Sequence, residues 1–291
     1  AVRPDLATRH GGRKPTAWTP PAPRRGAEAA ADSFRFDRKT YRRTGIIRLG
    51  QADLKEVWGC CTFSVQFPRE RKTWAIAVAH ASQLFRNVTG ADDRYVDGNH
   101  YLATGIQESS LGADPASDRF TYRFPAPYPI RYQPAAAGDG FFQVVASSAF
   151  VELQRMFPAR FAGRTHAELV SGNRFETSVL TQAYYNVFAY QFFVGSGFRP
   201  GAFTAEARDP QALARLLAYG YNRGVWNDTI RGIFTDRRAT CARLPSMADA
   251  EGRCFPATGD EGSNYVRYVP RYGRDLVAAS RRAASKYPGS F

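Results

Sequence analysis

One glutamate in this chain stands where its carboxyl group could act as a general acid. Tyr101, Gly105 and Glu108 fall at i, i+4 and i+7 of a predicted helix, with Leu102 and Ile106 on the adjoining apolar stripe. Glu108 would close that helix, where the negative end of the helix dipole and the apolar neighbours both disfavour a charged carboxylate. We therefore expect a raised pKa at Glu108, which suits an acid that protonates a glycosidic oxygen. The alternative is a solvated glutamate at a helix end.

Two later segments carry side chains that could assist such an acid in catalysis. Gly140-Phe141-Phe142-Gln143 is a turn-like segment that ends on an amide and leads into a predicted helix. Tyr221-Asn222-Arg223-Gly224 ends a helix rich in Ala and Leu. A hydroxyl and an amide would thus be available beside the carboxyl group if the fold brought the three segments together.

In order along the chain, Glu108-Ser109-Ser110 and the 140–143 and 221–224 segments resemble the soluble lytic transglycosylase and goose-type lysozyme family. That family cleaves peptidoglycan glycan strands and has a lysozyme-like fold. Its patterns are a glutamate followed by serine at a helix end, a Gly-Leu-Met-Gln turn and an Ala-Tyr-Asn-x-Gly segment. The resemblance covers residues 74–235. This chain departs from the family in having two phenylalanines for Leu-Met and a longer interval between the first two motifs.

The resemblance implies a role for each matching residue. It assigns Glu108 as the catalytic acid/base, Ser109 or Ser110 as a supporting hydroxyl, Gln143 as a sugar-contacting amide, Tyr221 as the hydroxyl near the glutamate, and Asn222 as a residue of the same substrate-binding set that would hold the turn. Cleavage between N-acetylmuramic acid and N-acetylglucosamine would then need no metal and no cofactor. The expected enzyme is a lytic transglycosylase, with a lysozyme- or chitinase-like hydrolase as the alternative.

Hydrolysis with inversion would require a second carboxylate to activate water, at about 6.5–9.5 Å from the first. Asp114, Asp118 and Asp139 are candidates by proximity in sequence, and solvated loop positions are the plainer interpretation for all three. They flank or lie in the segment 112–139, which we interpret as an insertion beside the active site. Its tyrosines could stack on sugar rings or pack the loop on itself.

Helical periodicity predicts the elements that would position these groups. Apolar residues recur at helical spacing over 73–88, 148–157, 174–193 and 209–221, and Pro158 is expected to end the second of these. Asp209 and Pro210 would cap the fourth. Short strands or an irregular lead-in are expected between Phe34 and Phe67. The predicted fold class is mainly α (α+β), a lysozyme-like helical domain.

The net charge of +14 is concentrated at the two ends of the chain. Residues 1–48 carry 12 Lys/Arg against 4 Asp/Glu, and residues 267–291 carry 6 against 1, which leaves 49–266 nearly neutral. We therefore divide the chain into an extended basic arm (1–48), a catalytic domain (49–266) and a basic C-terminal helical extension (267–291). A protein assembly or an anionic polymer could grip residues 1–48, and the chain could then be a non-catalytic, lysozyme-like subunit.

The cysteines, the hydropathy and the N-terminal residue indicate where the protein is located. The four cysteines, Cys60, Cys61, Cys241 and Cys254, lack metal-ligand spacing, and any disulfides among them would imply an oxidising compartment. No run approaches a membrane span of about 20 apolar residues, and an N-terminal Ala is compatible with a removed signal peptide. We expect a periplasmic or secreted protein, or one associated with a virion or envelope. Sparse aromatic residues among the basic ones disfavour nucleic acid as the partner.

Overall fold

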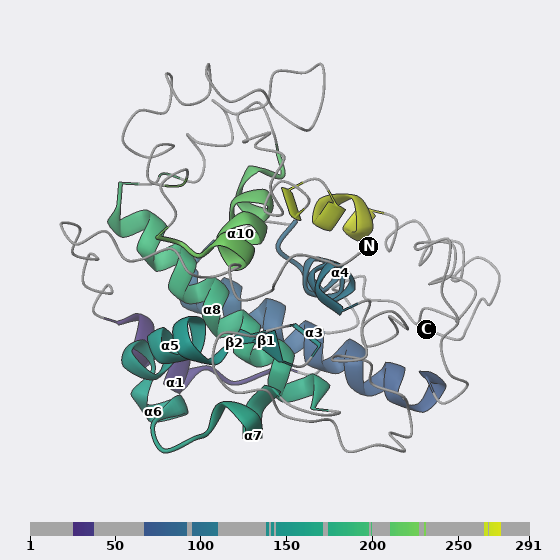
Figure 1. Cartoon of the computed structure of the whole chain (residues 1–291), viewed down its shortest axis with the longest axis horizontal. Coiled ribbons are helices and arrows are strands. Elements are labelled where there is room, and N and C mark those ends of the chain that lie inside the picture. Colours follow the sequence, from purple (N-terminus) through teal and green to yellow (C-terminus); the bar gives the residue numbers. More distant parts are fainter. Residues whose placement is uncertain are drawn as a thin grey trace, which may run out of the picture.

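The computed structural model describes residues 26–37, 67–91, 95–109, 138–139, 141–142, 144–170, 174–197, 199, 210–226, 230, 265–266 and 268–274. This part of the chain is mainly helical, as expected (Figure 1). Its helices are Ala27–Ser33 (α1), Phe67–Thr89 (α3), Gly98–Ser109 (α4), Ala146–Phe150 (η4, a π-helix), Val151–Met156 (α5), Pro158–Phe161 (α6), His166–Val170 (α7), Phe175–Gly195 (α8) and Ala212–Arg223 (α10). Gly138–Asp139 (β1) and Val144–Val145 (β2) form an antiparallel pair.

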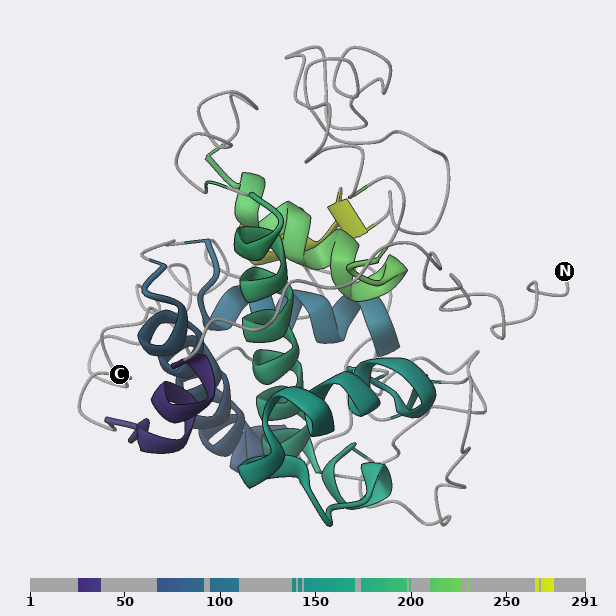
Figure 2. The ribbon, with the colours of Figure 1, turned by 90° about the vertical axis from the view of Figure 1, so that its left-hand side faces the viewer.

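Helix α8 lies at the centre of the described core. Its hydrophobic residues are distributed all round the helix, which is the pattern of a helix with no solvent-facing side. Every side chain from Ser178 to Phe193 is buried. Helices α3, α4, α5, α7 and α10 all pack against it, as Figures 1 and 2 show from two directions. Segments that are far apart in the sequence therefore meet on the surface of one helix.

The long helices predicted from periodicity are confirmed. Helix α3 contains the predicted stretch 73–88, and the residues on its predicted inner face between Ala77 and Val88 are buried. Helix α8 matches the prediction for 174–193 and ends before Gly197, whose φ of 94° favours glycine. These helices are specified locally because bulky apolar residues recur at the helical period over many turns.

The predicted helix 148–157 is divided in the structure. A π-helix, η4, precedes α5, and α5 ends at Met156. Pro158 then begins α6 at its first position, where a missing backbone N–H costs nothing. The expectation that Pro158 ends a helix is thus correct, and the start of the next helix at the same residue was not predicted.

Helix α10 begins later than the sequence suggested. Its N-cap is Gln211, and Pro210 lies in the turn before it. The predicted N1 role of Pro210 is therefore wrong, and Asp209 lies outside the described residues. The helix ends as expected before Gly224, whose φ of 81° is a backbone conformation that side chains disfavour.

The basic arm predicted for residues 1–48 contains a helix that packs on the body. Helix α1 buries Ala27 and Ala31 in the main core and contacts α3. The Gln83 amide of α3 also hydrogen-bonds both the N–H and the C=O of Asp37, each at 3.0 Å. An extended arm is therefore wrong for α1, because an alanine-rich run has high helix propensity and small side chains that allow close approach to α3.

The C-terminal extension predicted from residue 267 is helical where the structure describes it, and its first residues pack on the body. The described residues between 265 and 274 are helical and lie beside α10 (yellow in Figures 1 and 2). Val266 and Val269 are fully buried, and the Arg215 guanidinium of α10 donates a hydrogen bond to the Val266 carbonyl at 2.5 Å. This segment thus belongs to the main core, because its apolar residues have a partner surface on α10.

Several expectations fall on residues that the structure does not describe. These are the four cysteines, the lead-in from 38 to 66, and the insertion from 112 to 137 with Asp114 and Asp118. Of the helices that the structure does describe, none has the length and apolar character needed to cross a membrane.

Candidate active site

Glu108 lies in the last turn of α4, where the sequence placed it. The helix begins after Asp97, whose carboxylate accepts hydrogen bonds from the backbone N–H groups of Asn99 (2.9 Å) and His100 (3.2 Å). This is the usual N-cap arrangement, since the first N–H groups of a helix have no partner within it. Tyr101, two turns before Glu108, is fully buried and fixes the same face of α4 in the core. Glu108 itself is half-buried.

The segment before Gln143 is the loop of the β1–β2 hairpin. Gly138 pairs with Val145 and Asp139 with Val144, so residues 140–143 connect the two strands. Phe141 and Phe142 are completely buried in this loop, and their rings lie 5.3 and 5.6 Å from that of Phe175 at the start of α8. The two aromatic residues thus anchor the loop, which fixes the backbone immediately before Gln143.

His166 and the π-helix η4 define the backbone on the other side of Gln143. The His166 Nε2 atom is 2.6 Å from the Val144 carbonyl oxygen, which ties α7 to β2. Burial lowers the pKa of His166, and the bond to Val144 acts in the opposite direction. The π-helix follows β2 directly. Because π-helical turns are rare and are frequently found at functional sites, η4 supports placing a functional site in this region.

Tyr221 joins this loop to the end of α10. Its hydroxyl donates a hydrogen bond to the Phe142 carbonyl oxygen at 2.5 Å, and its side chain is buried. The pKa of Tyr221 is raised well above its ordinary value, first by burial, then by the negative charge of Glu108 and then by Tyr185. The hydrogen bond thus joins the hairpin loop to the end of α10, and the charge of Glu108 at the end of α4 acts on the same hydroxyl.

The structure describes only some of the other predicted site residues. Asn222 is buried, and its Oδ1 atom accepts no hydrogen bond within the described part of the chain, while its predicted role in holding the turn stays a prediction. Ser109 is the last residue of α4. The Ser109 side chain, Ser110 and Gln143 lie outside the described residues, and their predicted roles stay predictions.

Sequence reasoning missed two buried polar residues near this site. Tyr185 of α8 packs its ring against that of Tyr221, with centroids 5.3 Å apart and planes at 84°. Glu152 of α5 is 4% exposed and forms an ion pair with Arg155 at 2.9 Å, and its charge contributes to a raised pKa of Tyr185, for which burial is the main cause. Both residues sit within hydrophobic runs, where periodicity indicates burial and says nothing about their polar atoms.

No metal centre is formed by the described residues, since none of their His, Cys, Asp and Glu side chains gather in groups of three or more. His100 is completely buried and His166 is bonded to the Val144 carbonyl. We compared the chain with protein-family models, with curated proteins and with solved structures, and none of the three comparisons found a match.

Proposed function

We propose that this protein cleaves peptidoglycan glycan strands between N-acetylmuramic acid and N-acetylglucosamine, as a lytic transglycosylase with Glu108 as its acid/base. The observation that carries the proposal is the convergence of Glu108 and Tyr221 with the loop that precedes Gln143. These three segments resemble a catalytic glutamate motif, a sugar-binding turn and a Tyr-Asn segment of one enzyme family, and they come from three separate parts of the chain. The lysozyme-like fold belongs to the same proposal.

The proposed reaction uses one carboxyl group twice. Protonated Glu108 gives its proton to the oxygen that bridges the two sugars, and the bond from that oxygen to C1 of N-acetylmuramic acid breaks. The 6-hydroxyl of the same sugar then bonds to C1, and its proton returns to Glu108. The products are a shortened strand with a 1,6-anhydro end and a free 4-hydroxyl on N-acetylglucosamine. Water is not consumed, so no second carboxylate is needed.

Tyr221 is proposed to keep Glu108 in its acid form. Because the Tyr221 hydroxyl donates its proton to the Phe142 carbonyl, it can offer only oxygen lone pairs to Glu108. Lone pairs accept a hydrogen bond from a protonated carboxyl group and repel a carboxylate, so this neighbour should raise the pKa of Glu108. The half-buried position of Glu108 at a helix C-terminus acts in the same direction. An acid with a raised pKa keeps its proton at a higher pH.

The deciding experiment is digestion of purified peptidoglycan by the parent and by Glu108→Gln, with the products analysed by mass. Loss of the acid should reduce the rate by about 10²–10⁴-fold, the usual contribution of such a group. Glu176→Gln is the matched control, since Glu176 is an exposed glutamate in the first turn of α8. Equal clearance by Glu108→Gln and the parent would show that the assignment is wrong. A fully folded parent without activity would favour the non-catalytic subunit.

Hydrolysis is the second candidate, and Glu152 is the buried carboxylate in this part of the core that has to be weighed for it. Glu152 acts electrostatically on Tyr185, whose ring contacts Tyr221, so a second acid lies in this part of the core. Its ion pair with Arg155 and its 4% exposure leave it poorly placed to activate water. Product mass separates the two reactions, because hydrolysis gives reducing ends that are one water heavier than 1,6-anhydro ends.

The proposed substrate lies outside the cytoplasm, so we also propose a periplasmic, secreted or envelope-associated protein. An assembly partner or anionic polymer that binds the basic residues of 1–48 could localise the enzyme on the cell wall. Separating cell fractions and assaying each for the protein would test the proposed location.

A further inference from the structure

Tyr185 lies in the middle of α8, close to the end of α10. Its side chain is 4% exposed, and burial raises its pKa, so its hydroxyl keeps its proton. Helix α10 approaches α8 closely here, because Gly220 has no side chain. A Cβ atom at Gly220 would lie 3.1 Å from Cζ of Phe193 on α8. The Tyr185 hydroxyl can therefore reach the backbone of α10.

The Tyr185 hydroxyl provides hydrogen-bond partners for backbone groups at the end of α10. The last four carbonyl groups of an α-helix have no N–H partner within the helix, and in α10 these belong to residues 220–223. The Tyr185 hydroxyl donates a hydrogen bond to the Gly220 carbonyl at 3.3 Å. The backbone of Val225, just beyond the helix end, hydrogen-bonds the same hydroxyl. One phenol group thus connects the two sides of the turn that contains Tyr221 and Asn222.

The Tyr185 ring also contacts the residue that this turn presents to the site. The rings of Tyr185 and Tyr221 meet edge to face, with centroids 5.3 Å apart. On its other side, the Tyr221 hydroxyl is bonded to the Phe142 carbonyl. Tyr221 is therefore held by Tyr185 at its ring and its backbone turn, and by the hairpin loop at its hydroxyl.

We propose that Tyr185 is a positioning residue for the candidate active site, and that it sets the place of the Tyr221 hydroxyl relative to Glu108 by capping the end of α10. This inference rests on the proposed transglycosylase function. Tyr185 touches neither the substrate nor the reacting atoms. Loss of the Tyr185 hydroxyl should move the turn that carries Tyr221. Because Tyr221 is proposed to raise the pKa of Glu108, that pKa should then change.

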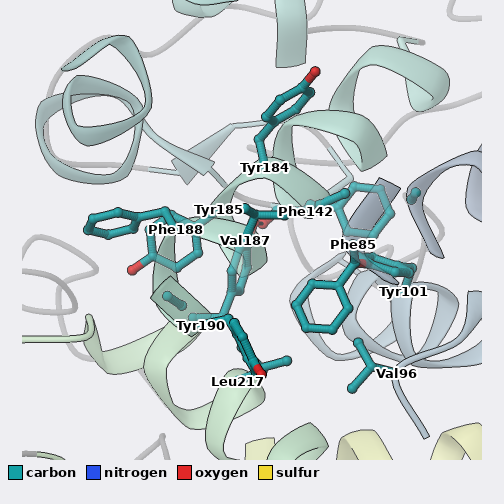
Figure 3. Packing of buried hydrophobic residues seen from close by; sticks show 14 of the residues in the cluster. Phe85, Val96, Tyr101, Phe142, Tyr184, Tyr185, Val187, Phe188, Tyr190 and Leu217 are labelled. Atoms are coloured by element: carbon teal, nitrogen blue, oxygen red, sulfur yellow. Dashed lines mark hydrogen bonds between the residues drawn. The ribbon is translucent and has the colours of Figure 1, made fainter. Parts of the chain in front are cut away.

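The test is Tyr185→Phe, which keeps the ring and removes the hydroxyl. Tyr184→Phe is the matched control, because Tyr184 is the neighbouring tyrosine of α8 but packs on Phe157 and Phe161, at 5.0 and 5.1 Å. Figure 3 shows Tyr184 directed away from the other labelled core residues. We expect Tyr185→Phe to lower kcat by about ten- to hundredfold, the cost of a small misplacement of catalytic groups. We expect KM to change less than kcat, because the substitution acts on the acid through Tyr221 and removes no group that is proposed to bind the substrate.

The pH dependence is a readout that a purely structural role would not move. If Tyr185 positions Tyr221 against Glu108, the variant should lose activity at a lower pH than the parent, because Glu108 gives up its proton more easily. Amide hydrogen exchange of residues 220–226 should also become faster in Tyr185→Phe and stay unchanged in Tyr184→Phe. An unchanged kcat and pH profile in a folded Tyr185→Phe protein would overturn the inference.

A second variant covers the case in which Tyr185→Phe does not fold. Gly220→Ala keeps every hydroxyl but forces the α10 turn or Phe193 to shift by a few tenths of an ångström. It should lower kcat more than it changes KM, and an unchanged kcat would contradict the inference if hydrogen exchange of residues 220–226 shows that the turn has shifted. Glu108→Gln is assayed beside both variants. If the parent is active and Glu108→Gln has no effect, the proposed function fails, whereas an inactive Glu108→Gln with an unaffected Tyr185→Phe overturns only the role of Tyr185.

Discussion

The hydroxyl of Tyr221 donates a hydrogen bond to the carbonyl oxygen of Phe142 at 2.5 Å, and 79 residues separate the two in the chain. Tyr221 lies in the last turn of α10 and Phe142 lies in the hairpin loop, so this bond connects two elements that form independently of each other. Both groups are buried, which makes the bond costly to break, because neither could exchange its partner for water. The charge of Glu108 reaches the same hydroxyl.

Tyr221→Phe should destabilise the protein and change its pH dependence. The buried Phe142 carbonyl would lose its donor, which should lower the free energy of unfolding by about 1–3 kcal/mol. Under the proposed function, the high-pH limb of kcat/KM should also shift to lower pH, because Glu108 loses the hydroxyl that is proposed to raise its pKa. Chemical denaturation and a pH–rate profile measure the two effects. Tyr184→Phe is the control, and a Tyr221→Phe protein that matches it in both measurements would exclude this role for Tyr221.

Arg215→Met should loosen the segment 265–274. The buried Arg215 guanidinium donates to the Val266 carbonyl, and removing it leaves this carbonyl without that donor, which should lower the free energy of unfolding by about 1–3 kcal/mol. Hydrogen exchange should become faster in residues 265–274. Arg274→Met is the control, since Arg274 is exposed and its contact with the Gln211 amide is longer, at 3.3 Å. Equal stability of the two variants would show that Arg215 does not hold the segment.

The free energy of unfolding should decrease as the pH falls from neutral, and His100 should account for part of this loss. Burial lowers the pKa of His100 from 6.5 to about 4, so the unfolded chain binds a proton more readily than the folded one. Its contribution is therefore complete above pH 6.5 and is lost as the pH falls toward 4, by about 3 kcal/mol in total. His80 and His166 also have lowered pKa values and act in the same direction.

Denaturation of the parent and of His100→Gln at several pH values measures this contribution. The difference in unfolding free energy between the two proteins should become smaller or reverse between pH 6.5 and 4, because the variant has no proton to take up at this position. A constant difference over that range would mean that His100 does not titrate differently in the folded and unfolded states.

The long helices could be predicted because each is specified by its own residues. In α3, apolar side chains recur on one face over several turns, which buries that face, whereas α8 is apolar all round over about five turns, which buries the whole helix. The position of Glu108 in the last turn of α4 follows from the same periodicity. The hairpin of β1 and β2 could not be found in this way, because two residues per strand are too few to show alternation.

Helix α1 shows why the boundaries of the body were misplaced. Its sequence contains no bulky residue at helical spacing, so the segment resembled the polar arm around it. Its stability depends on α3, where Ala27 and Ala31 are buried and where His80 stacks on Phe36 with ring centroids 4.8 Å apart. Contacts of this kind are specified by the partner surface, which local periodicity does not describe.

The amino-acid order was sufficient for the mainly helical class, for the main helices and for a glutamate at the end of one of them, since these depend on interactions between residues a few positions apart. The meeting of Glu108, Tyr221 and the Phe142 carbonyl, and the contact of Tyr185 with the end of α10, were established only by the packing of distant segments around α8. Periodicity indicates that a residue is buried. Which polar atoms meet once it is buried depends on how the helices cross and on which backbone groups lack partners there.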